Sequence, residues 1–226
     1  MGNNTAALLR LLWSDARLSL AAFWSTLIAC EIFFLLVSLY FGGFVVVSGW
    51  LAVYIFAVIS GFAAVQNTFP VALGWSMPRK DYYVAAVIHF VLLALAISVL
   101  YMALYGFEQT FTSMFAKGSF QFFTAPFQSE PTFGLLLWLH FIASMTLLSV
   151  GFFFGCLYFR FGRLGVMAFF AITVMLIAFL AEKTFAAIGS FEAFLLWLIP
   201  FNFVVLGAAW LFLRQAPPKQ HSSSRR

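Results

Sequence analysis

Six long apolar stretches divide this chain, and they constrain its fold more than any other feature. A helix needs about 20 apolar residues to cross the hydrocarbon core of a bilayer. Only 8% of the 226 residues are charged, whereas soluble domains carry roughly 25%, so most of the surface cannot face water. We therefore predict an all-α, polytopic membrane protein with six transmembrane helices, at residues 19–41, 44–65, 82–106, 133–158, 165–181 and 193–213.

The two ends of the chain differ from this predicted six-helix domain, residues 19–213. Residues 1–18 have the period of an amphipathic helix, with leucines on one face and Arg10 and Arg17 on another. Such a helix is predicted to lie flat in the membrane interface. The alternative is that it simply extends the first transmembrane helix. Residues 214–226 are polar and contain prolines, so we predict a disordered cytoplasmic tail.

Lysine and arginine are distributed unequally between the predicted sides of the membrane. With the N-terminus in the cytoplasm, only Lys117 and Lys183 fall outside. This bias predicts that both termini are cytoplasmic. The basic residues form no stripe that could follow phosphates, so nucleic acid is not an expected partner. The residues on the cytoplasmic side are Arg10, Arg17, Arg79, Lys80, Arg160, Arg163, Arg214, Lys219, Arg225 and Arg226.

The link between the second and third apolar stretches carries the most specific pattern in the chain. It runs from Gln66 to Tyr83 and reads QNTFPVALGWSMPRKDYY. Thr68 is a good cap for a short helix with Pro70 in its first turn, because proline lacks an amide hydrogen that would be unpaired there. Gly74 is predicted to end that helix in a left-handed conformation.

A second helix is predicted to follow directly after this short one. Ser76 can cap it, Pro78 is tolerated in its first turn, and Asp81 lies near the positive end of its dipole.

The short helix is predicted to expose an apolar face to the cytoplasm. Phe69, Leu73 and Trp75 would form this face, flanked by Arg79 and Lys80. Large exposed apolar patches usually mark interfaces, so the face is a candidate docking site for a partner protein. The alternative is an ordinary loop whose basic residues only fix the topology.

This link, with the amphipathic N-terminal segment and six predicted spans, resembles the membrane subunit of a type-2 ABC exporter. Small bacterial permeases of that family often carry F-P-x-A-L-x-x-G-x-x-R-[RK]-x-[FY]-[FY] at this place. The chain departs from that form at Gly74, which comes early, and at Pro78. The matching residues are Phe69, Pro70, Ala72, Leu73, Arg79, Lys80, Asp81, Tyr82 and Tyr83.

The resemblance implies that the link is a coupling helix seated in a groove of a separate ABC ATPase subunit. It implies an export system of the bacterial plasma membrane, in which this chain and a second permease, a copy or a paralogue, form the pathway. ATP and Mg²⁺ would be used by the ATPase alone, and the chain itself has no G-x-x-x-x-G-K-[ST] loop. We expect it to bind no cofactor. The expected coupling residues are Phe69, Pro70, Leu73, Trp75, Arg79, Lys80 and Asp81.

Two other function classes are weighed against this one. An intramembrane enzyme is not expected, because the chain has neither H-E-x-x-H nor a G-x-S-x-G-like turn. A membrane subunit that binds or scaffolds without transporting, such as the substrate-binding component of a vitamin uptake system, also fits six helices and stays open. The substrate is open as well.

Four polar residues inside the apolar stretches are candidates for the pathway or for helix packing: Glu31, His89, His140 and Asn202. A carboxylate near the middle of a span is costly unless it is paired, hydrated or protonated, and such residues are functional candidates. The two histidines are expected near opposite faces of the membrane, so no metal site is predicted.

Two further features of the apolar stretches bear on packing. Gly151 and Gly155 form a G-x-x-x-G pair, which lets another helix approach closely. The outer loop, residues 107–132, is rich in phenylalanine and is predicted to dip back into the membrane.

Overall fold

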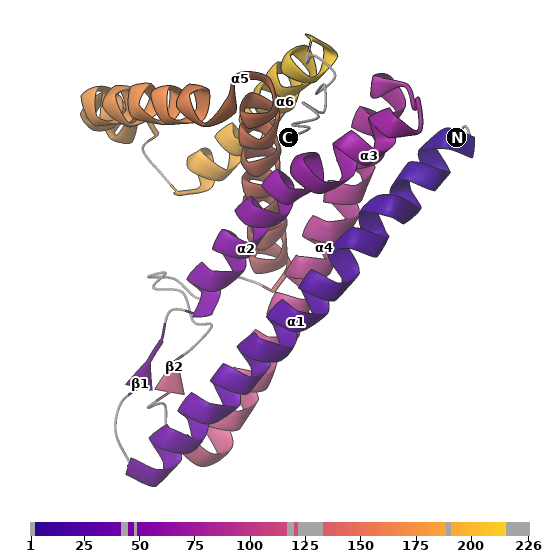
Figure 1. The fold of residues 1–226 in the computed structure, drawn as a ribbon. Coiled ribbons are helices and arrows are strands. Elements are labelled where there is room, and N and C mark those ends of the chain that lie inside the picture. The colour runs from indigo at the N-terminus through magenta and orange to yellow at the C-terminus, as the bar shows by residue number, and fades with distance from the viewer. Residues whose placement is uncertain are drawn as a thin grey trace, which may run out of the picture.

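The computed structural model of this protein is an elongated bundle of helices (Figure 1). It describes residues 3–41, 45–47, 49–116, 120–121, 133–188 and 191–215. The predicted all-α class is confirmed, since only two strands of two residues each interrupt the helices. The elements are α1 (Asn3–Phe41), β1 (Val45–Val46), α2 (Gly49–Ala63), the π-helical η1 (Ala64–Thr68), α3 (Phe69–Gly74), α4 (Arg79–Phe111), the π-helical η2 (Thr112–Ala116), β2 (Phe120–Gln121), α5 (Phe133–Ile188) and α6 (Phe191–Gln215).

Five helices in the described ranges are long and apolar enough to cross a membrane. The chain is therefore compatible with a membrane-embedded protein, whereas six spans are not confirmed. The five segments are Asn4–Phe41, Gly49–Gly74, Arg79–Met114, Phe133–Ile172 and Leu196–Gln215.

The predicted fifth span, 165–181, is not a separate helix after a loop. It continues α5, and the predicted link at 160–165 is only a kink at Gly162, which has φ 69° and ψ −164°. Glycine adopts such a backbone at little steric cost, so the helix can bend and resume within one residue. In Figure 1 the second half of α5 runs across the first half rather than back along it.

Residues 1–18 do not form the separate interfacial helix that the amphipathic pattern predicted. Residues 3–18 belong to α1, which is one helix of 39 residues and about 58 Å long at 1.5 Å per residue. No glycine or proline interrupts it. Leu8 and Leu12 are buried in the protein core, so protein rather than lipid covers the apolar face. The alternative, in which this segment extends the first span, is the one that the structure has.

Three glycines bring α2 and α5 into backbone contact. A Cβ added at Gly61 would strike the Leu148 carbonyl, and one at Gly151 would strike the Val58 carbonyl. At Gly155 it would lie 2.9 Å from the Val65 Cβ. The predicted G-x-x-x-G pair therefore serves packing inside this chain.

The region predicted as an outer loop, 107–132, begins with further helix. α4 extends to Phe111 and η2 continues it to Ala116, while β2 pairs in parallel with β1. The other end of this loop, 122–132, lies outside the described residues, as do Gly42, Gly43 and residues 216–226 of the predicted tail. The predicted loop at 182–192 is largely helical, because α5 reaches Ile188 and α6 begins at Phe191.

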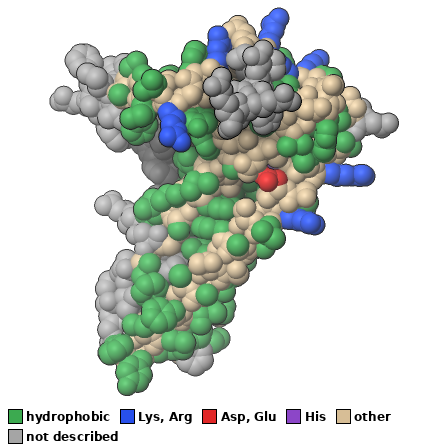
Figure 2. Space-filling model, viewed as in Figure 1, with side chains coloured by type: hydrophobic (Ala, Val, Ile, Leu, Met, Phe, Trp, Pro, Cys, Tyr) green, Lys and Arg blue, Asp and Glu red, His purple; other side chains and the backbone are tan. Residues whose placement is uncertain are grey.

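Basic side chains gather at one end of the bundle. Figure 2 shows lysine and arginine only in the upper part of the face that it draws, and hydrophobic side chains over the elongated lower part. Contacts between elements place several of them there: Arg79 binds the carbonyl of Arg214, and Arg160 binds the side chain of Gln215. We call this the basic end.

Candidate functional site

The predicted coupling segment lies at the basic end, where α2 gives way to α4. α3 does not start from a capped N-terminus, because helix continues into it from α2 through η1. Thr68 has helical backbone angles and makes no capping bond. Its hydroxyl instead donates to the Ala64 carbonyl one turn back. The expected Thr68 cap is therefore wrong, since the chain never leaves the helix there.

α3 ends at Gly74, as predicted, but the left-handed residue is Ser76, with φ 55°. The Met77 amide donates to the Ala72 carbonyl at 3.0 Å, and the Ser76 amide donates to the Leu73 carbonyl at 3.0 Å. These two bonds form a Schellman motif, in which the left-handed residue is usually glycine. Ser76 thus ends α3.

The start of α4 also differs from its expected cap. Pro78 precedes Arg79 with an extended backbone, and no side chain caps the helix. Ser76 is therefore not the cap that the sequence suggested. Asp81 does lie in the first turn of α4, where its charge favours the helix dipole.

The apolar face predicted for α3 is divided between core and surface. Phe69 is wholly buried, with its ring centroid 5.0 Å from those of Tyr82 and Phe159. Its expected exposure is wrong, because the chain stays helical from α2 through η1 into α3 and this turns Phe69 inward. Trp75 is 55% exposed and Val71 39% exposed, whereas Leu73 is half-buried and Pro70 and Lys80 are exposed. The exposed apolar surface of α3, which we call the α3 tip, consists of Pro70, Val71 and Trp75.

Hydrogen bonds join the α3–α4 turn to three other helices. The buried hydroxyl of Tyr82 donates to the Ala64 carbonyl at 2.7 Å and lies 3.0 Å from the Thr68 hydroxyl. Arg79 donates to the Arg214 carbonyl at 2.6 Å and so caps the C-terminal end of α6. On the α1 side, Asn4 reaches the Asp81 carboxylate at 3.5 Å.

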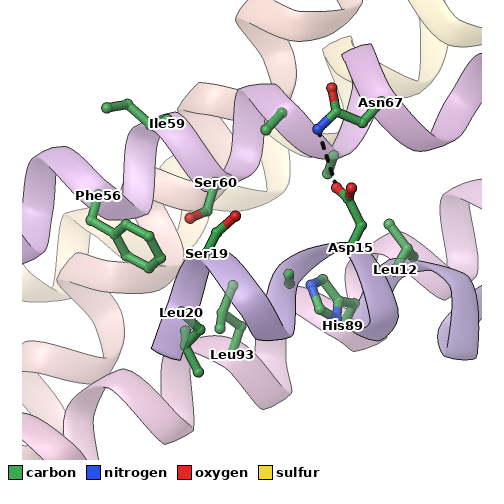
Figure 3. A pocket seen from close by; sticks show the side chains of 13 residues that line it. Leu12, Asp15, Ser19, Leu20, Phe56, Ile59, Ser60, Asn67, His89 and Leu93 are labelled. Atoms are coloured by element: carbon green, nitrogen blue, oxygen red, sulfur yellow. Dashed lines mark hydrogen bonds between the residues drawn. The ribbon is translucent and has the colours of Figure 1, made fainter. Parts of the chain in front are cut away.

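A small cavity with several polar residues in its walls lies between α1, α2, η1 and α4 (Figure 3). Asp15 of α1 accepts a bond from Asn67 of η1 at 3.2 Å. Ser19 and Ser60 point toward each other, and His89 of α4 lies on the far wall. Of the predicted candidates, only His89 lies here. Asp15, Ser19, Ser60 and Asn67 were not predicted, although Asp15 and Ser19 are four residues apart and so share one helical face, a detectable signal.

The size of this cavity limits what it can hold. Its volume is about 90 Å³, well below the roughly 300–1,000 Å³ of sites for drug-sized ligands. It has room for several water molecules or one small polar group. The cavity is therefore a small notch beside α1 and no pathway for a large substrate.

Glu31 is buried, with 1% of its surface exposed, and one carboxylate oxygen has no hydrogen-bond partner in the described part of the chain. Glu108 of α4 is also fully buried. The sequence placed Glu108 in the predicted outer loop, residues 107–132, whereas α4 continues to Phe111. Each of α1 and α4 therefore carries a buried carboxyl group.

His140 and Asn202 lie in separate contacts rather than in one site. The Tyr54 hydroxyl is 2.7 Å from His140 Nδ1, and the Tyr101 ring centroid is 3.7 Å from that of His140. Asn202 donates to the Thr146 hydroxyl at 2.7 Å. Both residues therefore hold helices together, as expected for polar groups in apolar surroundings.

Within the described residues, no three His, Cys, Asp or Glu side chains are grouped to hold a metal ion. In comparisons with known proteins, no protein-family model matches the chain, and no curated protein or solved structure is significantly similar to it.

Proposed function

We propose that this chain is the transmembrane subunit of an ABC-type export system, and that the α3 tip docks on a separate ATPase subunit. The observation that carries the proposal is the combination of an exposed apolar tip with a turn bonded to several helices. Trp75 is 55% exposed, while Tyr82 and Arg79 on the same turn are bonded to η1 and α6. A displacement of the α3 tip would therefore be transmitted to η1 and α6, to which the turn is hydrogen-bonded.

In this proposal the chain carries no ATPase site and is no enzyme. ATP and Mg²⁺ act on the partner, and a second permease, identical or related, completes the pathway. The basic end would face the cytoplasm, with both termini inside.

Trp75→Ala tests the docking. Aromatic residues often dominate the binding energy of interfaces, so we expect a roughly tenfold or greater loss of affinity for an ABC ATPase that copurifies with this chain. Affinity is measured with purified proteins in detergent. Trp138→Ala is the matched control, because Trp138 is 48% exposed but lies on α5 away from the tip. Unchanged binding of the Trp75 variant would refute the proposed docking surface.

The side of the membrane is tested by Gly74→Cys. A Cβ at Gly74 meets nothing within 4 Å, so a cysteine fits there without strain. We expect an impermeant thiol reagent to label it only after the cells are opened. Labelling on intact cells would place the tip outside, where no ATPase can reach it.

The alternative, a binding or scaffold subunit that does not transport, predicts a different response. Both could bind an ATPase, but only an exporter subunit requires the tip for transport-dependent ATP hydrolysis. The measurement is ATP hydrolysis by the assembled complex with native and Trp75→Ala chains. If the Trp75→Ala chain no longer docks and ATP hydrolysis is unchanged, the scaffold function is favoured.

A further inference from the structure

An apolar groove lies between α2 and the two halves of α5. Its volume is about 490 Å³, within the range of ligand sites, roughly 300–1,000 Å³. No polar side chain lines it among the described residues, so whatever fills it is apolar there. Its walls include Val58, Phe62, Phe154, Val166, Met167 and Phe170.

Close packing fixes the shape of this groove. α2 and the first half of α5 touch through Gly151, which meets the Val58 carbonyl. The second half of α5 is held against the first by Phe169, whose ring centroid lies 5.2 Å from that of Phe153 and 6.0 Å from that of Phe154. The groove is thus a feature of the packed chain.

Arg163 lies at one end of the apolar strip that the second half of α5 contributes. Val166, Met167 and Phe170 follow it at spacings of three, four and seven residues, so all four share one helical face. Arg163 is exposed, and no hydrogen bond or ion pair engages it within the residues that the structure describes. Its neighbour Arg160 differs, since it donates to Gln215 at 2.7 Å and lies over the ring of Phe161.

The surroundings of Arg163 favour an anion. The second half of α5 begins directly after Gly162, so the positive end of its dipole lies beside the guanidinium. A guanidinium binds phosphate through paired hydrogen bonds. Arg163 also lies at the basic end of the bundle, which for a chain in a bilayer is the level of the lipid headgroups.

We propose that the groove binds an acyl chain of an anionic phospholipid whose headgroup is held by Arg163. A phospholipid carries a phosphate and an apolar chain on one molecule, so it can bind the Arg163 guanidinium and fill the apolar groove at the same time. The excess positive charge at this end selects a headgroup with net negative charge over a zwitterionic one. The proposal needs only that the chain lies in a bilayer and does not depend on the transport function.

The test uses the full chain in detergent and two lipids with identical dioleoyl chains, phosphatidylglycerol and phosphatidylcholine. Binding is measured by native mass spectrometry and by the midpoint of thermal unfolding. We expect phosphatidylglycerol to bind more tightly and to raise the midpoint more. Arg163→Gln should weaken phosphatidylglycerol binding roughly tenfold, since it removes a hydrogen bond between charged groups, and leave phosphatidylcholine unchanged.

Two variants control this result. Arg17→Gln removes an exposed arginine of α1, far from the groove along the chain, and should leave lipid preference intact. Met167→Asp places a charge in the groove at a side chain that is 68% exposed, so the fold tolerates it, and should weaken binding of both lipids. Equal binding of the two lipids by the native chain, or equal losses in the Arg17 and Arg163 variants, would overturn the proposal. So would disulfide-linked dimers of a Met167→Cys chain in membranes, because a second copy would then fill the groove.

Discussion

The α2–α5 pair and the α1–α4 pair are held together by different means. α2 and α5 approach until glycine backbones meet carbonyl groups, at Gly61 and Gly151. α1 and α4 contact each other through side chains, such as the rings of Trp13 and His89, whose centroids lie 6.4 Å apart. Much of the far half of α1 is exposed, for example Leu36 at 57% and Phe41 at 75%.

This difference separates a fixed part of the bundle from an adjustable one. Backbone contact leaves no room for a side chain to yield, so α2 and the first half of α5 form one unit. A helix held by side chains and bordered by a cavity can shift with less disturbance. In the proposed exporter, α1 is therefore the helix that moves when the α3 tip is displaced, and its exposed apolar face meets lipid or the second permease.

Gly151→Ala should have the largest effect. The added Cβ falls on the Val58 carbonyl, which cannot move without shifting α2. We expect the free energy of unfolding to drop by about 3 kcal/mol, measured by denaturant titration in detergent. Gly207→Ala is the control: nothing lies within 4 Å of its Cβ, so alanine should be neutral or stabilise α6 by up to about 1 kcal/mol. Equal effects at both sites would show that the two helices do not touch.

Tyr54→Phe tests a polar contact between the same two helices, α2 and α5. It removes the hydroxyl that lies 2.7 Å from His140 Nδ1 and leaves that buried ring without its partner. The expected loss is about 1 kcal/mol, the usual size of a hydrogen bond between membrane helices. Tyr40→Phe, at a side chain that is 84% exposed, should change nothing. A larger loss for Tyr40 would contradict this ranking.

Glu31→Gln probes the α1–α4 pair and should act in the opposite direction. It replaces a buried carboxyl group, one oxygen of which has no hydrogen-bond partner among the described residues, by a neutral amide, so we expect unfolding to become harder by somewhat less than about 1 kcal/mol. The same denaturant titration measures it. If stability falls instead, the carboxyl group has a stabilising partner such as a cation.

Leu36→Ala should have the smallest effect on the isolated chain. Leu36 is 57% exposed on α1, and its truncation should change stability by less than about 0.5 kcal/mol. The informative measurement is the comparison of monomer and dimer in detergent. A marked loss of dimer with unchanged monomer stability would identify this face of α1 as the contact with the second permease.

The sequence predicted the local structure of the docking segment only in part. The end of α3 at Gly74 and the place of Asp81 in the first turn of α4 are confirmed. The expected caps at Thr68 and Ser76 are wrong, and the left-handed residue is Ser76 rather than Gly74. The exposure of Phe69 was predicted wrongly, because the passage from α2 into α3 remains helical and turns that ring toward Phe159. Arg79, predicted from its charge as a docking residue, caps α6, a contact 135 residues away in the chain that no local pattern contains.

By itself, the sequence determined that long apolar helices dominate this chain, because stretches with so few charges can be covered only by lipid or by each other. It did not determine which of these two covers a given face, since lipid tails and a protein interior are equally apolar. That is why Leu8 and Leu12 were assigned to the membrane interface and lie in the core, and why 165–181 continues past Gly162 as a bent helix. Only the tertiary structure decided those contacts, because it alone brings Gly61 against α5 and Trp13 beside His89.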